Sequence, residues 1–388
     1  MKIISVVGAR PNFMKIAPFA HAIEAHNIAA SSDLKIEHLL VHTGQHYDDK
    51  MSKTFFEALN IPEADINLNI GSGSHAEQVG HTMIAFEEVL KEHRPDWVVV
   101  VGDVNATCAC SITAKKEHIK VAHIESGLRS FDLKMPEEIN RMVTDRLSDL
   151  LLTPCRFSNE NLRNEGVGDD RIRFVGNIMI DTLEAQREKA ANLNVSQIVD
   201  SHLLMSDQHT TTSKGELAED FAVMTMHRPS NVDVKEVLDS IIDFLCDEVA
   251  VDLPLLWPIH PRARKQLESF QLWDKVVNTE NLILLHPLGY HELLRLNMEA
   301  SVVLTDSGGL QEECCVLGTP CLTLRWNTER PVTLLENGGA SVLVGNDVSR
   351  IREAYREARS SDSKPQRPEL WDGVSARRIV EALVNYEQ

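Results

Sequence analysis

The chain has 388 residues, of which 43% are hydrophobic and 25% are charged. These values are typical of a globular protein, and the length predicts two domains. The formal net charge of −19 argues against nucleic acid as a partner, because no basic surface dominates the chain. No apolar run reaches the length of a membrane helix, and the N-terminal MKIISVVGARP lacks the apolar core of a signal peptide. We therefore expect a cytoplasmic protein with no membrane partner.

The seven cysteines fit neither a zinc site nor a disulfide framework. Their number is odd, their spacing is irregular, and most of them lie in apolar segments. The sequence therefore predicts reduced thiols in the core and no metal site.

Short β-rich runs alternate with longer helical patterns along the whole chain. Runs such as VVVV at 98–101 do not alternate with polar residues, which is typical of strands covered on both faces. Strict alternation of strand and helix predicts parallel, doubly wound sheets, so the fold class is α/β with two Rossmann-like domains. The predicted strands are 3–7, 36–41, 97–101, 121–124, 150–152, 172–175, 221–225, 255–259, 282–285, 302–305, 321–324 and 341–344.

The predicted domain boundary follows a helical segment at 180–191. We expect an N-terminal domain at 1–190, a C-terminal domain at 191–365, and a final amphipathic helix at 366–388. The polar segment 206–219 is predicted to be a loop. Two such domains would bury a ligand in the cleft between them, near the carboxyl ends of both sheets.

The second half contains TDSGGLQEE, in which Ser307, Gly308 and Gly309 join an apolar strand to a helix. This arrangement offers backbone N–H groups to a phosphate, and glycine lets the backbone approach an anion closely. Glu313 would lie about one turn into the helix, where its carboxylate can accept hydrogen bonds from ribose hydroxyls. The turn therefore predicts a nucleotide diphosphate site, and the alternative is an ordinary glycine-rich βα turn.

Three carboxylates follow strands or open a helix in the first half: Asp103, Glu125 and Glu137. Neighbouring carboxylates in a dry cleft raise one another's pKa, which suits them to general acid and base catalysis. The alternative for each is a solvated loop acid or a helix cap. Glu137 has the weakest case for catalysis, because acids are favoured in any first helical turn.

The candidate cations for an anionic ligand are Arg10, Lys15, Arg129, Arg141 and Arg330, some of which must be ordinary salt-bridge partners. Arg10 and Lys15 belong to the loop GARPNFMK, which is not a GxGxxG fingerprint, so no dinucleotide cofactor is expected. His227 follows a predicted strand, and it either has a structural role or faces the diphosphate.

Together these motifs resemble a known family. GARPNFMKIAP, HTGQH, VVGDVNATCA, HIESGLRSFDLKMPEEINR, NENLRNEG, VGNIMIDTL, MHRPSNVD and TDSGGLQEE with TERP are similar to segments of the non-hydrolysing UDP-N-acetylglucosamine 2-epimerases. The resemblance implies the glycosyltransferase-B architecture, a homodimer, and a C-terminal helix that crosses back onto the first domain. It also implies reversible interconversion of UDP-N-acetylglucosamine and UDP-N-acetylmannosamine without metal or nicotinamide.

The resemblance also implies roles for individual residues. The catalytic positions correspond to Asp103, Glu125, Glu137 and His227. The substrate-binding positions correspond to Arg10, Lys15, Arg141, Ser307, Gly308, Gly309 and Glu313. Some bacterial members have a second, regulatory UDP-N-acetylglucosamine site, parts of which correspond to Gln45, Arg228 and His260, whereas Asp48 replaces one of its glutamines.

The implied chemistry is anti elimination of UDP to give 2-acetamidoglucal, followed by re-addition with the proton on the other face. A sister epimerase acting on a modified UDP-sugar, such as a diacetamido-glucuronate, would share these motifs. The remaining alternatives are the hydrolysing relative, which releases N-acetylmannosamine and UDP, a glycosyltransferase of the same fold, and a non-catalytic UDP-sugar sensor.

Overall fold

A computed structural model describes residues 1–8, 10–44, 62–204, 220–360 and 365–386. Gln45, Asp48 and the predicted loop 206–219 lie outside these residues. The chain divides into two compact units. Unit 1 comprises Met1–Ala185 and Glu369–Gln388, and unit 2 comprises Gln186–Pro368. Each unit contains its own parallel sheet.

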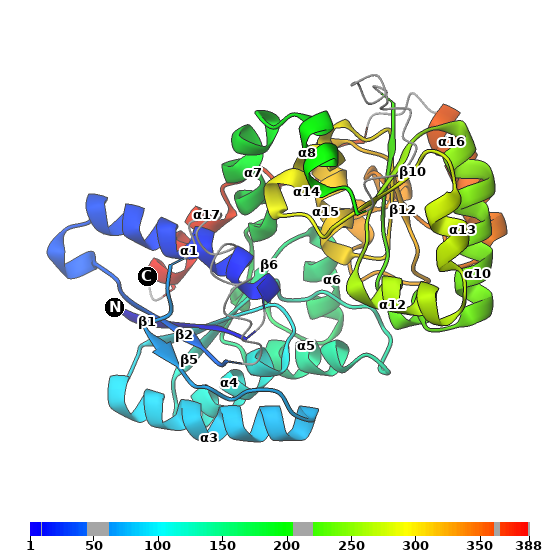
Figure 1. Cartoon of the computed structure of the whole chain (residues 1–388). Coiled ribbons are helices and arrows are strands. Elements are labelled where there is room, and N and C mark those ends of the chain that lie inside the picture. Colours follow the sequence, from blue (N-terminus) through cyan, green and yellow to red (C-terminus); the bar gives the residue numbers. More distant parts are fainter. Residues whose placement is uncertain (9, 45–61, 205–219, 361–364, 387–388) are drawn as a thin grey trace. The chain divides into compact units, whose positions relative to one another are not determined.

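The sheet of unit 1 has the strand order β3-β2-β1-β4-β5-β6-β7, and its neighbouring strands run parallel (Figure 1). The chain starts near the middle and winds outward in both directions, as the alternation of strands and helices predicts. β3 is the only one of these strands that was not predicted, because two residues carry no recognisable pattern. The strands are β1 (Lys2–Val7), β2 (Glu37–His42), β3 (Ile66–Asn67), β4 (Trp97–Val101), β5 (Lys120–Ile124), β6 (Leu150–Thr153) and β7 (Ile172–Phe174).

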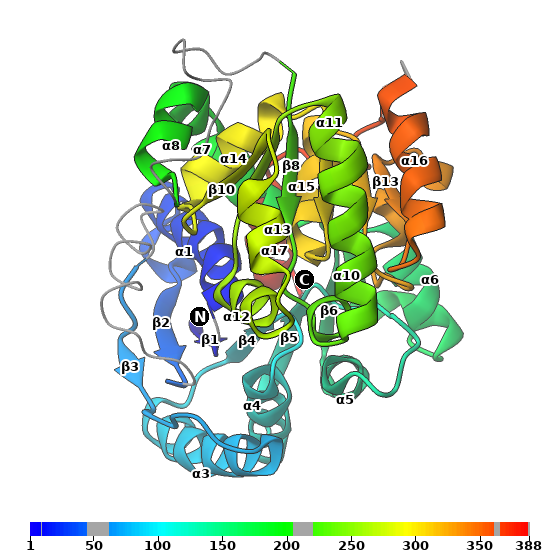
Figure 2. The same ribbon diagram turned by 45° about the vertical axis from the view of Figure 1, so that its right-hand side comes forward.

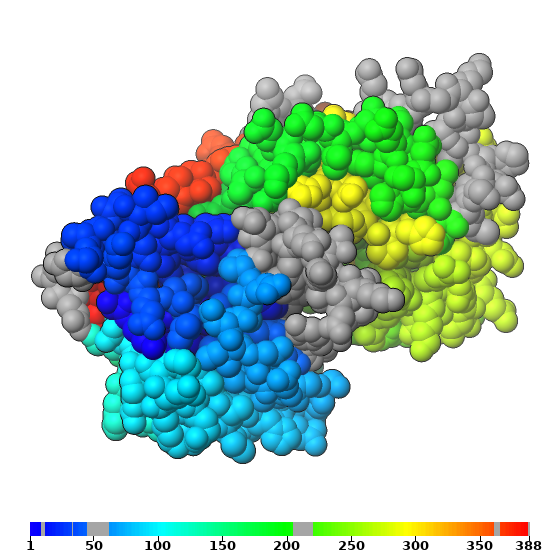
Figure 3. All heavy atoms as spheres, turned by 60° about the vertical axis from the view of Figure 1, so that its left-hand side comes forward, coloured from blue at the N-terminus to red at the C-terminus, as the bar shows by residue number. Residues whose placement is uncertain are grey.

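Helices cover both faces of this sheet. α1 and α17 pack together on one face, and α3 and α4 lie on the other, as Figures 1 and 2 show. α3 lies in the light blue to cyan part of the surface in Figure 3. On this helix, Lys91 pairs with Glu87 (3.2 Å) and Glu88 (3.1 Å). The helices of unit 1 are α1 (Arg10–Ala29), α3 (His75–His93), α4 (Asn105–Lys116), α5 (Pro136–Leu147), α6 (Arg156–Asn164), α7 (Ile178–Ala191), which runs into unit 2, and α17 (Ser375–Val384).

The sheet of unit 2 has the order β10-β9-β8-β11-β12-β13, again with parallel neighbours. Alternate residues of its strands fill two separate cores. Met224 faces the core that includes α10 and α16, whereas Val223 faces the core that includes α8, α14 and α15. The strands are β8 (Ala222–Thr225), β9 (Leu255–Pro258), β10 (Leu282–Leu285), β11 (Val302–Thr305), β12 (Cys321–Thr323) and β13 (Ser341–Leu343). The helices are α8 (Val195–His202), α9 (Pro229–Val232), α10 (Lys235–Phe244), α11 (Ala250–Asp252), α12 (Pro261–Ser269), α13 (Trp273–Asn278), α14 (Tyr290–Glu299), α15 (Gly308–Leu317) and α16 (Val348–Ser360).

Both units are therefore Rossmann-like, as predicted. The seven cysteines are buried and free. Within the described ranges, no helix is both long and apolar enough to cross a membrane.

The last segment of the chain is fixed to unit 1 by buried polar contacts. The Asp181 carboxylate on α7 accepts hydrogen bonds from the backbone N–H groups of Ser375 (3.0 Å) and Ala376 (2.7 Å) at the start of α17. The buried Trp371 donates its indole N–H to the Pro154 carbonyl at 2.9 Å. At Gly176, a Cβ would lie 2.1 Å from the Leu370 carbonyl oxygen, so only glycine allows this approach.

We predict that Asp181 makes the stability of the protein depend on pH. Burial raises the pKa of Asp181 to about 6, although the N–H groups of Ala376 and Ser375 act in the opposite direction. The folded state therefore binds more protons than the unfolded chain between about pH 4 and 6. The stabilising contribution of the protonated group is complete below about pH 4 and is lost as the pH rises through 6.

Urea unfolding between pH 4 and 7 should show Asp181→Asn gaining about 3 kcal/mol relative to wild type as the pH rises, because the amide does not titrate. Asp170→Asn, at an exposed position of unit 1, is the control and should show no such trend. A constant difference between Asp181→Asn and wild type over this range would contradict the prediction.

Candidate active site

Three of the predicted residues meet at the carboxyl edge of the sheet in unit 1. Lys15 lies in α1, Asp103 follows β4, and Glu125 follows β5, so parallel strands deliver all three to the same edge. Gly102 lies between them: a Cβ at this position would be 3.4 Å from Lys15 Nζ and 3.5 Å from Glu125 Oε2. A Cβ here would only touch the Lys15–Glu125 pair, but Gly102 has a left-handed φ of 68°, which favours glycine at this position.

Glu125 and Lys15 form a buried ion pair, with 3% and 9% of their side chains exposed. The backbone of Glu125 is left-handed, with φ of 69°. This conformation costs a residue with a side chain about 1–2 kcal/mol. It is held by the Leu152 carbonyl, which accepts hydrogen bonds from the backbone N–H groups of Glu125 (3.1 Å) and Ser126 (3.2 Å). Strain of this kind concentrates at functional sites, where it aims a side chain.

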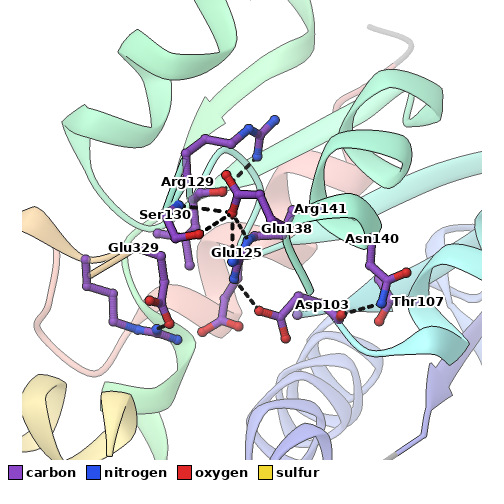
Figure 4. Close-up of polar contacts among 12 residues, drawn as sticks. Asp103, Thr107, Glu125, Arg129, Ser130, Glu138, Asn140, Arg141 and Glu329 are labelled. Carbon is purple, nitrogen blue, oxygen red and sulfur yellow. Dashed lines mark hydrogen bonds and ion pairs between the residues drawn. The ribbon is translucent and has the colours of Figure 1, made fainter. Parts of the chain in front are cut away.

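Asp103 pairs with Arg141 of α5, whose Nη1 donates to Asp103 Oδ2 at 2.5 Å (Figure 4). Arg141 is buried and also donates to Glu138 through Nη2 (2.8 Å) and Nε (3.1 Å). Glu138 in turn accepts from the backbone N–H groups of Ser130 (3.0 Å) and Phe131 (2.9 Å). Burial raises the pKa of Glu138, but Ser130 and Arg141 outweigh this effect and lower it. Glu138 therefore fixes the orientation of Arg141.

The remaining acid, Glu137, is exposed in the first turn of α5. It lies four residues before Arg141 and so shares a face of the helix with it. Neither of the two carboxylate–cation pairs at the strand edge includes Glu137. The side chain of Arg10 lies outside the described part of the structure. Arg129, another candidate cation, instead forms a buried ion pair with Asp145 (2.7 Å) and a second ion pair with the exposed Glu165 (2.7 Å).

In unit 2, the predicted turn forms the N-terminus of α15. The Ser307 hydroxyl caps the helix by accepting from the backbone N–H of Leu310 at 3.5 Å. A Cβ at Gly308 would lie 3.1 Å from Arg330 Nη1 and 3.3 Å from Arg325 Nη1. Two guanidinium groups therefore lie beside a helix N-terminus, where the helix dipole already favours an anion.

Buried glutamates balance these two guanidinium groups. Arg325 pairs with Glu329 at 2.7 Å, Arg330 pairs with Glu312 at 2.6 Å, and Arg330 also contacts Glu329. All four side chains are at least nine-tenths buried. Arg325 was not predicted, because its position in LRWNTER shows no pattern until the turn packs against it.

Asp306 was also not among the predicted site residues. Its fully buried carboxylate accepts from His227 Nδ1 (2.8 Å), from the backbone N–H groups of His227 (3.0 Å) and Arg228 (2.8 Å), and from Asn231 Nδ2 (3.1 Å). Burial raises the pKa of Asp306, but His227 and the N–H groups outweigh this effect and lower it. Because Asp306 holds Nδ1, the Nε2 atom of the half-exposed His227 points away from Asp306 and is available to a ligand. The signal in the sequence was an aspartate at the end of a strand, directly before Ser-Gly-Gly.

Glu313 is buried in α15. Burial raises its pKa to about 7, and the neighbouring charge of Glu312 adds to this, whereas hydrogen bonding to Tyr290 and Asn297 acts in the opposite direction. A carboxyl group of this pKa changes its charge near neutral pH. His260 and Arg228 lie next to His227: the rings of His227 and His260 are 5.5 Å apart, and Arg228 follows His227 in the chain.

The fold and these groups define the class of the protein. Two Rossmann-like units, one with paired acids and cations and the other with a glycine turn backed by arginines, are typical of α/β enzymes that bind phosphorylated ligands. The chain is similar over 98% of its length to the structure of the lipopolysaccharide outer core galactosyltransferase WaaB, covering 95% of that chain, with a TM-score of 0.53 at 14% identity. This similarity places the fold in the glycosyltransferase-B type.

The chain belongs to the UDP-N-acetylglucosamine 2-epimerase family, whose model matches residues 28–384, and the protein is therefore an isomerase. It is 40% identical to the UDP-N-acetylglucosamine 2-epimerase of Methanocaldococcus jannaschii over 385 residues, 99% of each chain. The structure of that enzyme in complex with UDP-GlcNAc and UDP matches with a TM-score of 0.84 at 39% identity, covering 99% of both chains. The UDP-2,3-diacetamido-2,3-dideoxy-D-glucuronate 2-epimerase of Pseudomonas aeruginosa is 36% identical over 385 residues, 99% of each chain.

Proposed function

We propose that this protein interconverts UDP-N-acetylglucosamine and UDP-N-acetylmannosamine by anti elimination of UDP and its re-addition to 2-acetamidoglucal. The observation that carries the proposal is the pair of acids at one strand edge, each bound to a cation: Glu125 to Lys15 and Asp103 to Arg141. The similarity to the M. jannaschii enzyme over the whole chain supports the choice of substrate.

The chemistry explains why several acids and cations are needed. The proton on carbon 2 of the sugar is not acidic, so its removal has to accompany departure of the UDP group. One carboxylate takes this proton, and another returns a proton to the opposite face. Asp103, Glu125 and Glu137 share these two transfers. The Lys15 ammonium and the Arg141 guanidinium balance the charge of the carboxylates as these gain and lose protons.

The nucleotide binds at the turn of unit 2 in this proposal. The N–H groups of Gly308 and Gly309 and the dipole of α15, which Ser307 caps, stabilise the diphosphate as it departs. The guanidinium groups beside Gly308 support this assignment. Arg10 adds a further positive charge, and His227, oriented by Asp306, donates to the leaving group through Nε2. Glu313 accepts hydrogen bonds from the ribose. No hydride is transferred in this route, so a nicotinamide has no role in it.

A second candidate is epimerisation of a more modified UDP-sugar. The 36% identity to the P. aeruginosa diacetamido-glucuronate epimerase favours it, since that similarity also spans the whole chain. A panel of UDP-sugars separates the two, and the proposed enzyme should turn over UDP-N-acetylglucosamine fastest. We further infer a cytoplasmic homodimer from the motifs shared with the non-hydrolysing epimerases, which sedimentation analysis can test.

Proton NMR in deuterated water tests the proposed function. The enzyme should replace the carbon-2 proton with deuterium while producing a stable mixture of the two UDP-sugars, with only traces of free UDP and glucal. Stoichiometric release of UDP and N-acetylmannosamine would instead identify a hydrolysing enzyme. Epimerisation without deuterium uptake would rule out the elimination mechanism.

Removing the acids should abolish turnover but not nucleotide binding. Asp103→Asn, Glu125→Gln and Glu137→Gln should each lower kcat about 10²- to 10⁴-fold, the usual contribution of a general acid or base. The affinity for UDP alone should change little, because these groups act mainly in the transition state. Glu92→Gln is the control, because Glu92 is an exposed residue of α3; this variant should keep full activity. Near wild-type turnover in any of the three variants would remove that residue from the catalytic set.

UDP binding should be linked to deprotonation of Glu313. Its pKa is raised to about 7 by burial, and only the ionised carboxylate accepts hydrogen bonds from both ribose hydroxyls. Below pH 7 the group has to lose its proton before binding, so affinity should rise with pH up to about 7 and then level off. Calorimetry in buffers of different ionisation enthalpy should show protons released by wild type that Glu313→Gln does not release. Equal proton release by both proteins would exclude this role for Glu313.

A further inference from the structure

A second buried carboxylate in unit 1 with several hydrogen-bond donors, also outside the proposed catalytic set, belongs to Asp145. It lies on α5 and is 1% exposed. It accepts hydrogen bonds from His123 Nδ1 (2.6 Å), Arg129 Nη1 (2.7 Å) and the backbone N–H of Gly127 (3.0 Å). Burial raises the pKa of Asp145, but His123 and Arg129 outweigh this effect and lower it. The proposed mechanism gives this charged group no task.

His123 continues the connection toward the candidate site. It is the fourth residue of β5 and is fully buried. Its Nδ1 faces the Asp145 carboxylate, and its Nε2 lies 2.8 Å from the Gly102 carbonyl oxygen. Both neighbours accept hydrogen bonds, so both ring nitrogens donate. The imidazole ring therefore links α5 to the loop that carries Asp103.

These contacts form a closed ring that includes Asp103 and holds both ends of the segment that carries Glu125. From Asp145 the ring passes through His123 to Gly102, whose chain neighbour is Asp103. Asp103 then binds Arg141, which lies on α5 one turn before Asp145. Glu125 lies in the segment between His123 and Gly127, and Asp145 binds both of these residues. One carboxylate thus fixes the loop of Glu125, the loop of Asp103 and the helix of Arg141.

We propose that Asp145 and His123 are positioning residues, which set the separation of the Asp103 and Glu125 carboxylates so that proton removal and proton return are matched. This inference rests on the proposed function. Neither residue needs to touch the substrate. If the two loops move apart, the return of the proton becomes slow relative to its removal. The glucal intermediate then leaves the enzyme more often.

The test compares kcat, KM and the ratio of released 2-acetamidoglucal to epimerised product. Asp145→Asn keeps the size of the side chain, but its amide N–H₂ group then faces groups that are themselves hydrogen-bond donors. We expect kcat to fall about 100-fold, the loss that a displacement of about 1 Å can cause. KM and the affinity for UDP should change less than about threefold, and the glucal ratio should rise.

Two variants of His123 test its hydrogen bond to Asp145 and its hydrogen bond to Gly102 separately. His123→Gln keeps a donor for the Gly102 carbonyl, and His123→Asn keeps one for Asp145, so each should lose part of the activity that Asp145→Asn loses. If Asp145→Asn does not fold, these two variants still test whether His123 positions the two acids. Ser148→Ala is the control: it removes a buried hydrogen bond at the C-terminal end of α5, from the hydroxyl of the C-cap residue Ser148 to the Thr144 carbonyl at 2.8 Å. It should keep wild-type kcat and a wild-type glucal ratio.

A spectroscopic measurement gives a readout that does not depend on activity. The His123 Nδ1 proton should give a low-field NMR signal that disappears in Asp145→Asn while UDP binding persists. Wild-type kcat and glucal ratio in folded Asp145→Asn or in both His123 variants would overturn the inference, as would an equal loss in Ser148→Ala. If the unaltered protein does not epimerise the substrate, the proposed function fails instead, and the two failures are thereby distinguished.

Discussion

A buried aspartate organises each unit, because a carboxylate without water has to be surrounded by donors. In unit 1 this is Asp145, and in unit 2 it is Asp306. Each accepts from the Nδ1 of a histidine, His123 or His227, and from the backbone of a loop at the carboxyl edge of its sheet. The donors come from segments that are distant in the sequence. The need to satisfy one charge therefore determines where several loops lie.

The same constraint explains how a chain with a net charge of −19 can present cations to an anionic ligand. Each cation of the described candidate site is held by a carboxylate, such as Glu138 beside Arg141 and Glu329 beside Arg325. A buried pair of this kind is nearly neutral, and breaking it by removing one partner leaves an uncompensated charge. Charge balance therefore keeps these cations in place without a bound ligand.

The sequence was sufficient for the parts that depend on local pattern. Continuous apolar runs such as 98–101 mark strands covered on both faces, and the residues that follow them are found at the sheet edge. Glu137 and Glu138 show where local pattern fails. They are adjacent in the sequence, yet Glu137 is exposed whereas Glu138 is buried and binds Arg141 and the loop at Ser130. Their difference depends on the rotation of α5 against the sheet, which long-range packing determines. The partners of Asp145 were missed for the same reason.

The return of the chain to unit 1 has a consequence for synthesis on the ribosome. Unit 2 is complete once Pro368 has emerged, whereas unit 1 still lacks α17, the helix that packs against α1. Since domains fold as their residues become available, the first unit to begin is the last to finish. Until the final turn of α17 leaves the exit tunnel, the face of α1 that it covers and the carboxylate of Asp181 remain open to water and to chaperones.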